Sequence, residues 1–131
     1  MPTIPASHLD LLTDEKRALA FLGTVMGDGS PQVTPVWFDT DGEYFYINTA
    51  QGRVKDRNLR ARPAVAMTIS DPHDPYRYIQ IRGQVVACTE EGANAHMDKL
   101  SYKYEDKPWN LPAGQVRVIF KIQPKRVTVH A

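Results

Sequence analysis

Residues 21–49 read FLGTVMGDGSPQVTPVWFDTDGEYFYINT, and this stretch decides the fold. It holds three runs rich in apolar, β-branched and aromatic residues, at 21–26, 32–38 and 44–49. The segments GDGS at 27–30 and TDGE at 40–43 separate these runs, and such glycine- and aspartate-rich segments are typical of tight turns. Three strands joined by short turns predict an antiparallel meander, in which each strand pairs with the next one along the chain.

Further strands are expected at 64–69 and 76–88, and a last strand pair at 116–122 and 126–129, around Pro124. About six strands, a few short helices and no regular alternation of strand and helix predict a mainly β protein. Its fold class is a closed or nearly closed antiparallel β-barrel rather than a doubly wound sheet. No repeat or linker divides the chain, so we expect a single domain over residues 1–131.

Short helices are expected between the strands. Ser7 and Thr13 are N-cap candidates for two short helices near the start of the chain. Asp56 and Arg60, four residues apart, favour a short helix that ends before Pro63. Another helix is expected to begin at 89–92, and an apolar stripe packs it on the barrel: Ala93, His96, Met97, Leu100 and Tyr104.

Composition narrows the class of protein. The chain has 131 residues, 42% of them hydrophobic, and a formal net charge of +1. Such a balanced charge predicts no nucleic-acid or membrane-surface partner. The chain also lacks a long apolar run and the pattern of a signal peptide, and Cys88 is its single cysteine, so we expect a soluble, cytoplasmic protein without an internal disulfide.

A cluster of cations follows the third predicted strand. Between residues 53 and 62 one acid, Asp56, stands among five bases: Arg53, Lys55, Arg57, Arg60 and Arg62. Guanidinium and ammonium groups beside the free backbone N–H groups of a helix start suit a phosphate, and the Thr49 hydroxyl can join them. A solvated basic helix is the alternative interpretation of this segment.

Polar residues on the predicted meander lie near this cluster. Gln32, Thr34 and Trp37 are expected on a strand next to the one that carries Tyr46 and Asn48, so these groups can meet the edge of a heterocycle. Ordinary strand alternation with a core tryptophan is the other interpretation.

No pattern of a catalytic triad or a metal site is present in the sequence. The four histidines have no neighbouring ligands at metal-binding spacing, the serines are not in a nucleophile elbow, and Cys88 lacks a local activating base. We therefore predict neither a catalytic side chain nor a metal, and we interpret His96 as a packing residue.

Several ordered motifs together resemble the pyridoxamine-5′-phosphate-oxidase-like split-barrel family, and most of all its branch of F420-dependent oxidoreductases. They are LGTV at 22–25, DGSPQVTPVWF at 28–38, DG at 41–42, NTA at 48–50, GRVKDRNL at 52–59, Pro63 and Gly83. The resemblance covers nearly the whole chain. It implies a six-stranded antiparallel split β-barrel of the FMN-binding type that forms a homodimer with a cofactor cleft shared between subunits.

The resemblance also implies a cofactor site. Its phosphate and acidic tail are held by the positions matching Arg53, Lys55 and Asn58, and its ring lies along two strands, against Gln32, Thr34, Pro35, Val36, Trp37, Asn48 and Thr49. The cofactor carries the hydride itself, so the protein supplies position, electrostatics and exclusion of water.

The expected function is therefore that of an oxidoreductase in which reduced deazaflavin coenzyme F420 transfers a hydride to an unsaturated small molecule. The acidic tail of this coenzyme favours it over FMN beside so many cations. Two alternatives stay open: an FMN-dependent oxidoreductase of the pyridoxamine-phosphate-oxidase type, and a non-catalytic carrier of flavin or haem.

Overall fold

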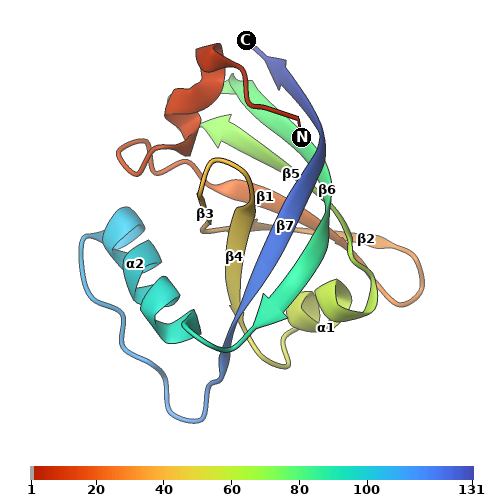
Figure 1. Ribbon diagram of the computed structural model, residues 1–131, viewed down its shortest axis with the longest axis vertical. Helices are drawn as coiled ribbons and strands as arrows, with labels where there is room; N and C mark the ends of the chain where they lie inside the picture. Colours follow the sequence, from red (N-terminus) through yellow and green to blue (C-terminus); the bar gives the residue numbers. More distant parts are fainter. Residues whose placement is uncertain (1) are drawn as a thin grey trace.

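The computed structural model describes residues 2–131 and shows a mainly β protein in which seven antiparallel strands form one curled sheet, a half-barrel, with three short helices at its rims (Figure 1). The strands are β1 (Ala20–Val25), β2 (Pro31–Val36), β3 (Asp39–Thr40), β4 (Phe45–Ala50), β5 (Ala64–Asp71), β6 (Asp74–Thr89) and β7 (Arg117–His130). The predicted mainly β, antiparallel barrel class is confirmed, but the number of strands is seven rather than six.

The order of the strands corrects the predicted meander. Across the sheet the order is β2-β1-β5-β6-β7-β4-β3, so β4 pairs with β7 and not with β2. The strand that carries Gln32 and the strand that carries Asn48 therefore lie near opposite edges of the sheet. The short connection from β2 through Trp37 and Phe38 to β3 brings those edges back toward each other.

The predicted last strand pair is a single strand, because β7 continues through Pro124. Proline has no backbone N–H and is tolerated in a sheet at edges and irregularities. Pro124 faces Gly83, where the register of the β6–β7 pairing shifts. A Cβ atom on Gly83 would lie 2.4 Å from the carbonyl oxygen of Gln123, so only glycine lets β7 come this close.

The inner face of the curled sheet forms the hydrophobic core. Alternate residues along each strand point inward, as the period of two in the sequence predicts. The largest fully buried side chains are Phe38, Phe120, Leu11, Leu22, Ile47, Leu59, Met67, Ile69, Ile79, Ile81, Leu100 and Ile122.

One helix replaces the two that the sequence predicts near its start. It is the 3₁₀ helix η1 (Ala6–Leu12), and Thr13 ends it instead of beginning a second helix. The helix is fixed to the barrel by buried Leu11 and by a hydrogen bond between His8 Nε2 and the carbonyl oxygen of His130, 2.8 Å long.

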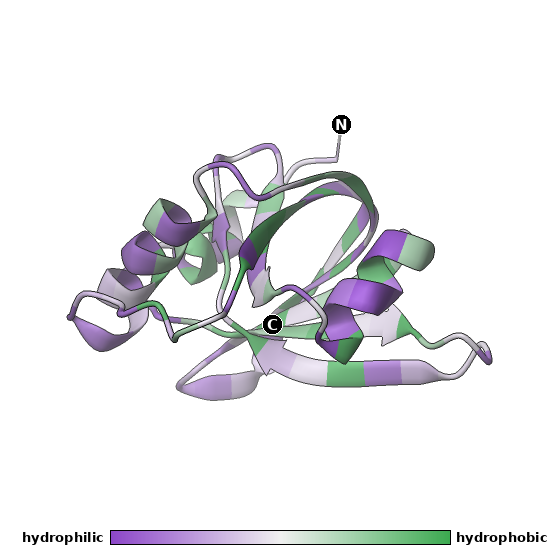
Figure 2. Cartoon of the chain, turned by 90° about the horizontal axis from the view of Figure 1, so that it is seen from below, coloured by the Kyte–Doolittle hydropathy of each residue, from purple (hydrophilic) through white to green (hydrophobic). Residues whose placement is uncertain are grey.

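The two α-helices lie on opposite sides of the barrel, and both carry strongly hydrophilic segments (Figure 2). They are α1 (Val54–Ala61) and α2 (Ala93–Glu105), close to the predicted positions. Among the described residues 2–131, neither these nor any other helix has the length and apolar character that crossing a bilayer requires.

Candidate functional site

A cleft of about 350 Å³ opens where β2, β4, the start of α1 and the start of β7 meet α2. Its lining residues are Leu19, Pro35, Val36, Trp37, Asn48, Thr49, Arg53, Lys55, Met97, Leu100 and Arg117. The cleft exists because the sheet curls: Pro35 and Asn48 come from strands near its opposite edges, yet both line the same hollow.

Seven of the ten positions predicted from the sequence line this cleft: Pro35, Val36, Trp37, Asn48, Thr49, Arg53 and Lys55. The other three do not. Gln32 and Thr34 lie on β2 away from the lining, and the side chain of Asn58 is occupied inside the fold. Its amide nitrogen donates to Thr24 Oγ1 over 3.0 Å, and its carbonyl oxygen accepts from Arg62 Nη2 over 3.1 Å.

Three cations meet in the cleft without a neutralising acid. Arg53, Lys55 and Arg117 all line it, and none of the described residues of the lining is a carboxylate. Burial lowers the pKa of Lys55, and the charges of Arg53 and Arg117 lower it further. Burial and then Arg53 lower the pKa of Arg117 to about 10. Positive charges that repel one another in a partly buried cleft define a place where an anion is stabilised.

The remaining basic residues of the predicted cluster serve the fold. Arg60 pairs with the buried carboxylate of Asp56 over 2.7 Å, and Arg62 donates to the carbonyl oxygen of Val25 over 2.6 Å. The other carboxylate oxygen of Asp56 accepts from the backbone N–H of Gly52, and this bond fixes the turn that leads to Arg53. The basic segment 53–62 is therefore divided between two roles: Arg53 and Lys55 line the cleft, whereas Arg60 and Arg62 bond to other parts of the fold.

Sequence reasoning missed Arg117, although it is the most firmly held cation of the cleft. Its Nε donates to Asn48 Oδ1 over 2.8 Å and its Nη1 to Gln115 Oε1 over 3.0 Å. The guanidinium also lies over the ring of Trp109, 5.3 Å from its centre. One pattern in the sequence indicates it: Arg117 directly precedes the apolar run Val118-Ile119-Phe120 at the start of a buried strand, and arginine is unusual at such a position.

Thr49, which lines the same cleft, carries a buried hydroxyl without a partner among the described residues. Its side chain is 1% exposed, and its Oγ1 has no hydrogen-bond partner among the described residues. A buried hydroxyl without a partner is costly and rare in native proteins. A ligand with acceptor oxygens that bonds to this hydroxyl would remove that cost, and the three cations suit a phosphate, so the residues present fit a phosphate-bearing cofactor.

An aromatic ring that stacks on a second ring forms another part of the cleft wall. The rings of Trp37 and Tyr104 are 5.2 Å apart at an angle of 6°. The hydroxyl of Tyr104 donates to the carbonyl oxygen of Ala18 over 2.7 Å, which fixes the stack to the segment that precedes β1. With Leu19, Pro35 and Leu100 this wall suits the face of a planar heterocycle.

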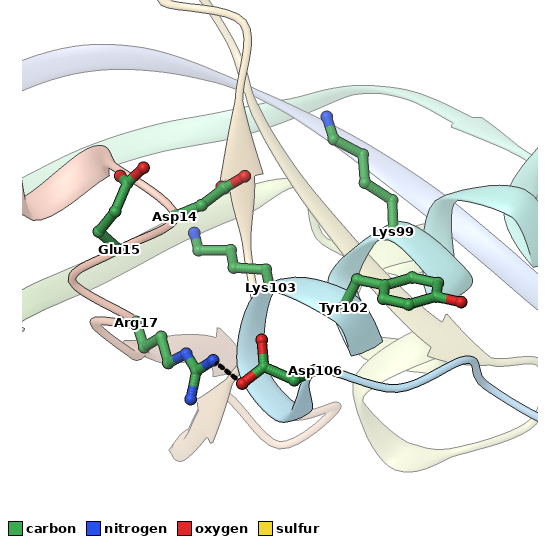
Figure 3. A pocket seen from close by; sticks show the side chains of 7 residues that line it. All are labelled: Asp14, Glu15, Arg17, Lys99, Tyr102, Lys103 and Asp106. Atoms are coloured by element: carbon green, nitrogen blue, oxygen red, sulfur yellow. Dashed lines mark hydrogen bonds and ion pairs between the residues drawn. The ribbon is translucent and has the colours of Figure 1, made fainter.

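A larger hollow of about 680 Å³ lies between residues 14–17 and the last turns of α2 (Figure 3). Its charges balance: Asp14, Glu15 and Asp106 stand against Arg17, Lys99 and Lys103. Arg17 pairs with Asp106, and Lys103 donates to the carbonyl oxygen of Phe38 over 2.8 Å. Because each of its three cations already has an acid or a backbone carbonyl as partner, this hollow is a weaker candidate than the smaller cleft.

The curled antiparallel sheet and its cation-lined, aromatic-walled cleft define the class of flavin-binding split-barrel proteins, most of which are oxidoreductases. The model of the pyridoxamine 5′-phosphate oxidase family matches residues 7–131, so the chain belongs to that family. None of the curated proteins matches it significantly.

Solved structures agree with the family. A protein described as an F420 reductase is 37% identical, with a TM-score of 0.84, over 95% of this chain and 98% of that one. General stress protein 26 from Bacillus anthracis is 21% identical, with a TM-score of 0.70, over 94% of each chain. HupZ from group A Streptococcus is 18% identical, with a TM-score of 0.72, over 97% of this chain and 94% of that one. The last two likenesses show the fold alone.

Proposed function

We propose that this protein is a reductase that binds the deazaflavin coenzyme F420 in the cleft and uses it to reduce an unsaturated small molecule. One observation carries the proposal: Arg53, Lys55 and Arg117 share a partly buried cleft with no carboxylate in its described lining. The resemblance to a protein described as an F420 reductase, 37% identical over almost the whole chain, supports the choice of coenzyme.

The cations of the cleft bind the acidic part of the coenzyme. Arg117 and Arg53 offer forked donors that match phosphate and carboxylate oxygens, and Lys55 adds a point charge. Thr49 donates its free hydroxyl to the same group of oxygens. FMN has one phosphate, whereas the deazaflavin carries a phosphate and a glutamate tail, so three cations without an acid favour the deazaflavin.

The aromatic wall orients the ring. Trp37 is held by its stack on Tyr104, and Pro35 and Leu19 extend the apolar surface on which a flat ring rests. When bound, the reduced coenzyme supplies the hydride. The protein then contributes a fixed position, a positive field and the exclusion of water, which explains why no side chain of the cleft needs to take part in the chemistry.

A second copy of this chain is the partner that we propose for the open side of the cleft. The strands β1 and β2 contain no charged residue, and Phe21 and Val33 on them are 42% and 64% exposed. Phe21 faces Pro35 in the register of the two strands, so this uncharged, apolar face continues directly into the cleft. Apolar surface without charge is typical of the core of homodimer interfaces. We further propose that the dimer works in the cytoplasm, where the exposed thiol of Cys88 stays reduced.

Titration of the purified protein with F420 and with FMN, side by side, tests the proposal. We expect tighter binding of F420, and steady-state oxidation of reduced F420 when enones or quinones are added. Lys55→Ala should weaken the binding of F420 by about 1–3 kcal/mol, the scale of a lost hydrogen bond to a charged group. Lys125→Ala, a change of an exposed lysine on β7, is the matched control and should leave the affinity unchanged.

Other outcomes point to the alternatives. Preference for FMN together with activity on pyridoxamine phosphate would favour the FMN-dependent oxidase type. Binding of a flavin or haem without turnover of any substrate would favour a carrier. Light scattering should give about twice the monomer mass, and a monomer that still binds F420 would contradict the shared cleft.

A further inference from the structure

A chain of hydrogen bonds leads from the protein surface to the cleft through four structural elements. Lys99 Nζ donates to Asp39 Oδ2 over 3.0 Å, and the other oxygen of Asp39 lies 2.7 Å from His96 Nε2. His96 Nδ1 lies 3.1 Å from Asn48 Nδ2, and Asn48 Oδ1 accepts from Arg117 Nε over 2.8 Å. The last two residues line the cleft, so the chain ends at the proposed anion site.

The donor and acceptor of every hydrogen bond in this chain follow from its two end residues, Lys99 and Arg117, because both can only donate. An arginine Nε can only donate, so the atom of Asn48 that faces Arg117 is its carbonyl oxygen. The amide nitrogen therefore points the other way, where it donates to the carbonyl oxygen of Ala93 over 2.8 Å and has a second hydrogen for His96. His96 Nδ1 must accept that hydrogen, so the ring carries its own proton on Nε2 and donates it to Asp39.

His96 and Asp39, the two middle residues of the chain, are both buried, and this burial stabilises the arrangement of their hydrogen bonds. The side chains of His96 and Asp39 are each only 11% exposed. Burial by itself raises the pKa of Asp39, but the hydrogen bonds from His96 and Lys99 and the charge of Lys99 hold that pKa below its usual value. Asp39 is thus a carboxylate that accepts two hydrogen bonds, and it has no proton to offer to His96.

Arg117 needs such support because its surroundings oppose it. Arg117 is buried, and the charge of Arg53 repels its guanidinium. Three of its N–H groups bond to Asn48, Gln115 and the sulfur of Met97, and none of the described residues accepts from the other two. If the Asn48 amide turned over, its NH₂ group would face Arg117 Nε, and two donors would meet. His96 Nδ1 and the carbonyl oxygen of Ala93 oppose this turn together, because both are acceptors and would then face the carbonyl oxygen of Asn48.

We propose that His96 is a positioning residue, which in its Nε2–H form locks the Asn48 amide so that Arg117 presents its free N–H groups to an anion in the cleft. The proposal deepens the proposed function and rests on it for the identity of the anion. It assigns a role to a histidine that the sequence alone suggested was a packing residue. It also explains how Asn48 contributes to the site: its amide is fully engaged within the protein, so it acts through Arg117.

Three substitutions of His96 separate the two bonds of the ring. His96→Asn keeps an acceptor near the position of Nδ1, His96→Gln keeps a donor near the position of Nε2, and His96→Leu keeps neither. We expect His96→Asn to bind inorganic phosphate and F420 nearly as the unchanged protein does. His96→Gln and His96→Leu should each bind roughly tenfold more weakly, the effect of one lost hydrogen bond to a charged group. A merely structural role, in which His96 ties α2 to Asp39, gives the opposite order, with His96→Gln retaining affinity, and that result would overturn the proposal.

Nuclear magnetic resonance of the ligand-free protein tests the same chain without any cofactor. Nitrogen shifts of the His96 ring should show a hydrogen on Nε2 and none on Nδ1, and a hydrogen on Nδ1 would overturn the proposal. The Nε–H of Arg117 should exchange slowly with solvent in the unchanged protein and in His96→Asn, and rapidly in His96→Gln; equal rates in all three would also overturn it. If these signals behave as expected and phosphate binds while F420 does not, the positioning role stands and the choice of coenzyme fails.

Discussion

Arg117 donates its Nε–H to Asn48 across 2.8 Å, and this bond joins β7 to β4 at the wall of the cleft. The two residues are diagonal neighbours on paired strands, since Ala50 faces Arg117 and Ile119 faces Asn48. A neutral partner holds the guanidinium in place and leaves its positive charge uncompensated. That combination suits an anion site, because a carboxylate in the place of Asn48 would neutralise the charge that the ligand needs.

The substitution Asn48→Asp tests this reasoning. The new carboxylate would pair with Arg117, so we expect affinity for phosphate to fall by about tenfold while the fold is retained. Asn94→Asp, at an exposed position in the first turn of α2, is the matched control and should bind as before. Calorimetric titration measures the affinity, and equal affinities of the two variants would contradict the role of the uncompensated charge.

Removal of the unsatisfied hydroxyl of Thr49 should affect the stability of the fold and the affinity for phosphate in opposite directions. Thr49→Val removes a buried polar atom that has no partner, so we expect the free energy of unfolding of the ligand-free protein to rise by about 1 kcal/mol. Affinity for phosphate should fall at the same time. Thr24→Val is the matched control, because Thr24 is equally buried but accepts from Asn58, and it should lower the free energy of unfolding. Urea denaturation of both variants measures the difference, and a loss of stability in Thr49→Val would show that the hydroxyl is satisfied.

The lowered pKa values of the cleft predict how anion binding depends on pH. An anion favours the protonated forms of Lys55 and Arg117. The affinity of the cleft for an anion is therefore highest below their pKa values and falls as the pH rises through them. For Arg117 that pKa is about 10. Sulfate is the suitable probe, because its own charge does not change in this range. Its affinity should be constant near neutral pH and should fall steeply as the pH approaches about 10. Constant affinity throughout this range would mean that neither residue contacts the anion.

Gly83 should tolerate no side chain. In Gly83→Ala the new Cβ would meet the backbone oxygen of Gln123, and backbone cannot move aside as the end of a flexible side chain can. We expect a loss of about 1–3 kcal/mol in the free energy of unfolding, as in other overpacked sites. Gly27→Ala is the control, since a Cβ there meets nothing within 4 Å. Thermal denaturation compares the two, and equal midpoints would show that β7 can shift at Pro124.

The local elements of this fold could be predicted from the sequence, because their signals are local. Alternation of polar and apolar residues predicted β6, and the short apolar runs between turn residues predicted β1, β2 and β4, within a few residues of their observed ends. Pairing could not be predicted in the same way. Nothing near residues 45–50 indicates that β4 pairs with a strand about seventy residues further on. Pro124 suggested a break, because the glycine that accommodates it lies on another strand.

The candidate site likewise has residues that local sequence signals predicted and residues that depend on strand pairing. Arg53 and Lys55 belong to a basic segment that is evident in the sequence, and the family resemblance implied a ring along residues 32–37 and 46–49. Arg117 was missed because it comes from β7, which reaches the cleft only through its pairing with β4. Asn58, in turn, was expected at the cofactor, yet its partners Thr24 and Arg62 occupy its amide within the fold. Neither fact is visible without the three-dimensional pairing.

The position of β7 also determines when the cleft can form as the chain is synthesised. Among residues 2–131, β4 pairs only with the two-residue strand β3 and with β7. Until the residues of β7 have left the ribosome, β4 therefore has no long partner and one side of the barrel stays open. Arg117 arrives on that same strand, so ligand-binding capacity and closure of the barrel appear together once β7 has been synthesised. Nascent chains that stall earlier should expose strand edges prone to aggregation and should be recognised by chaperones before they can take up an anion.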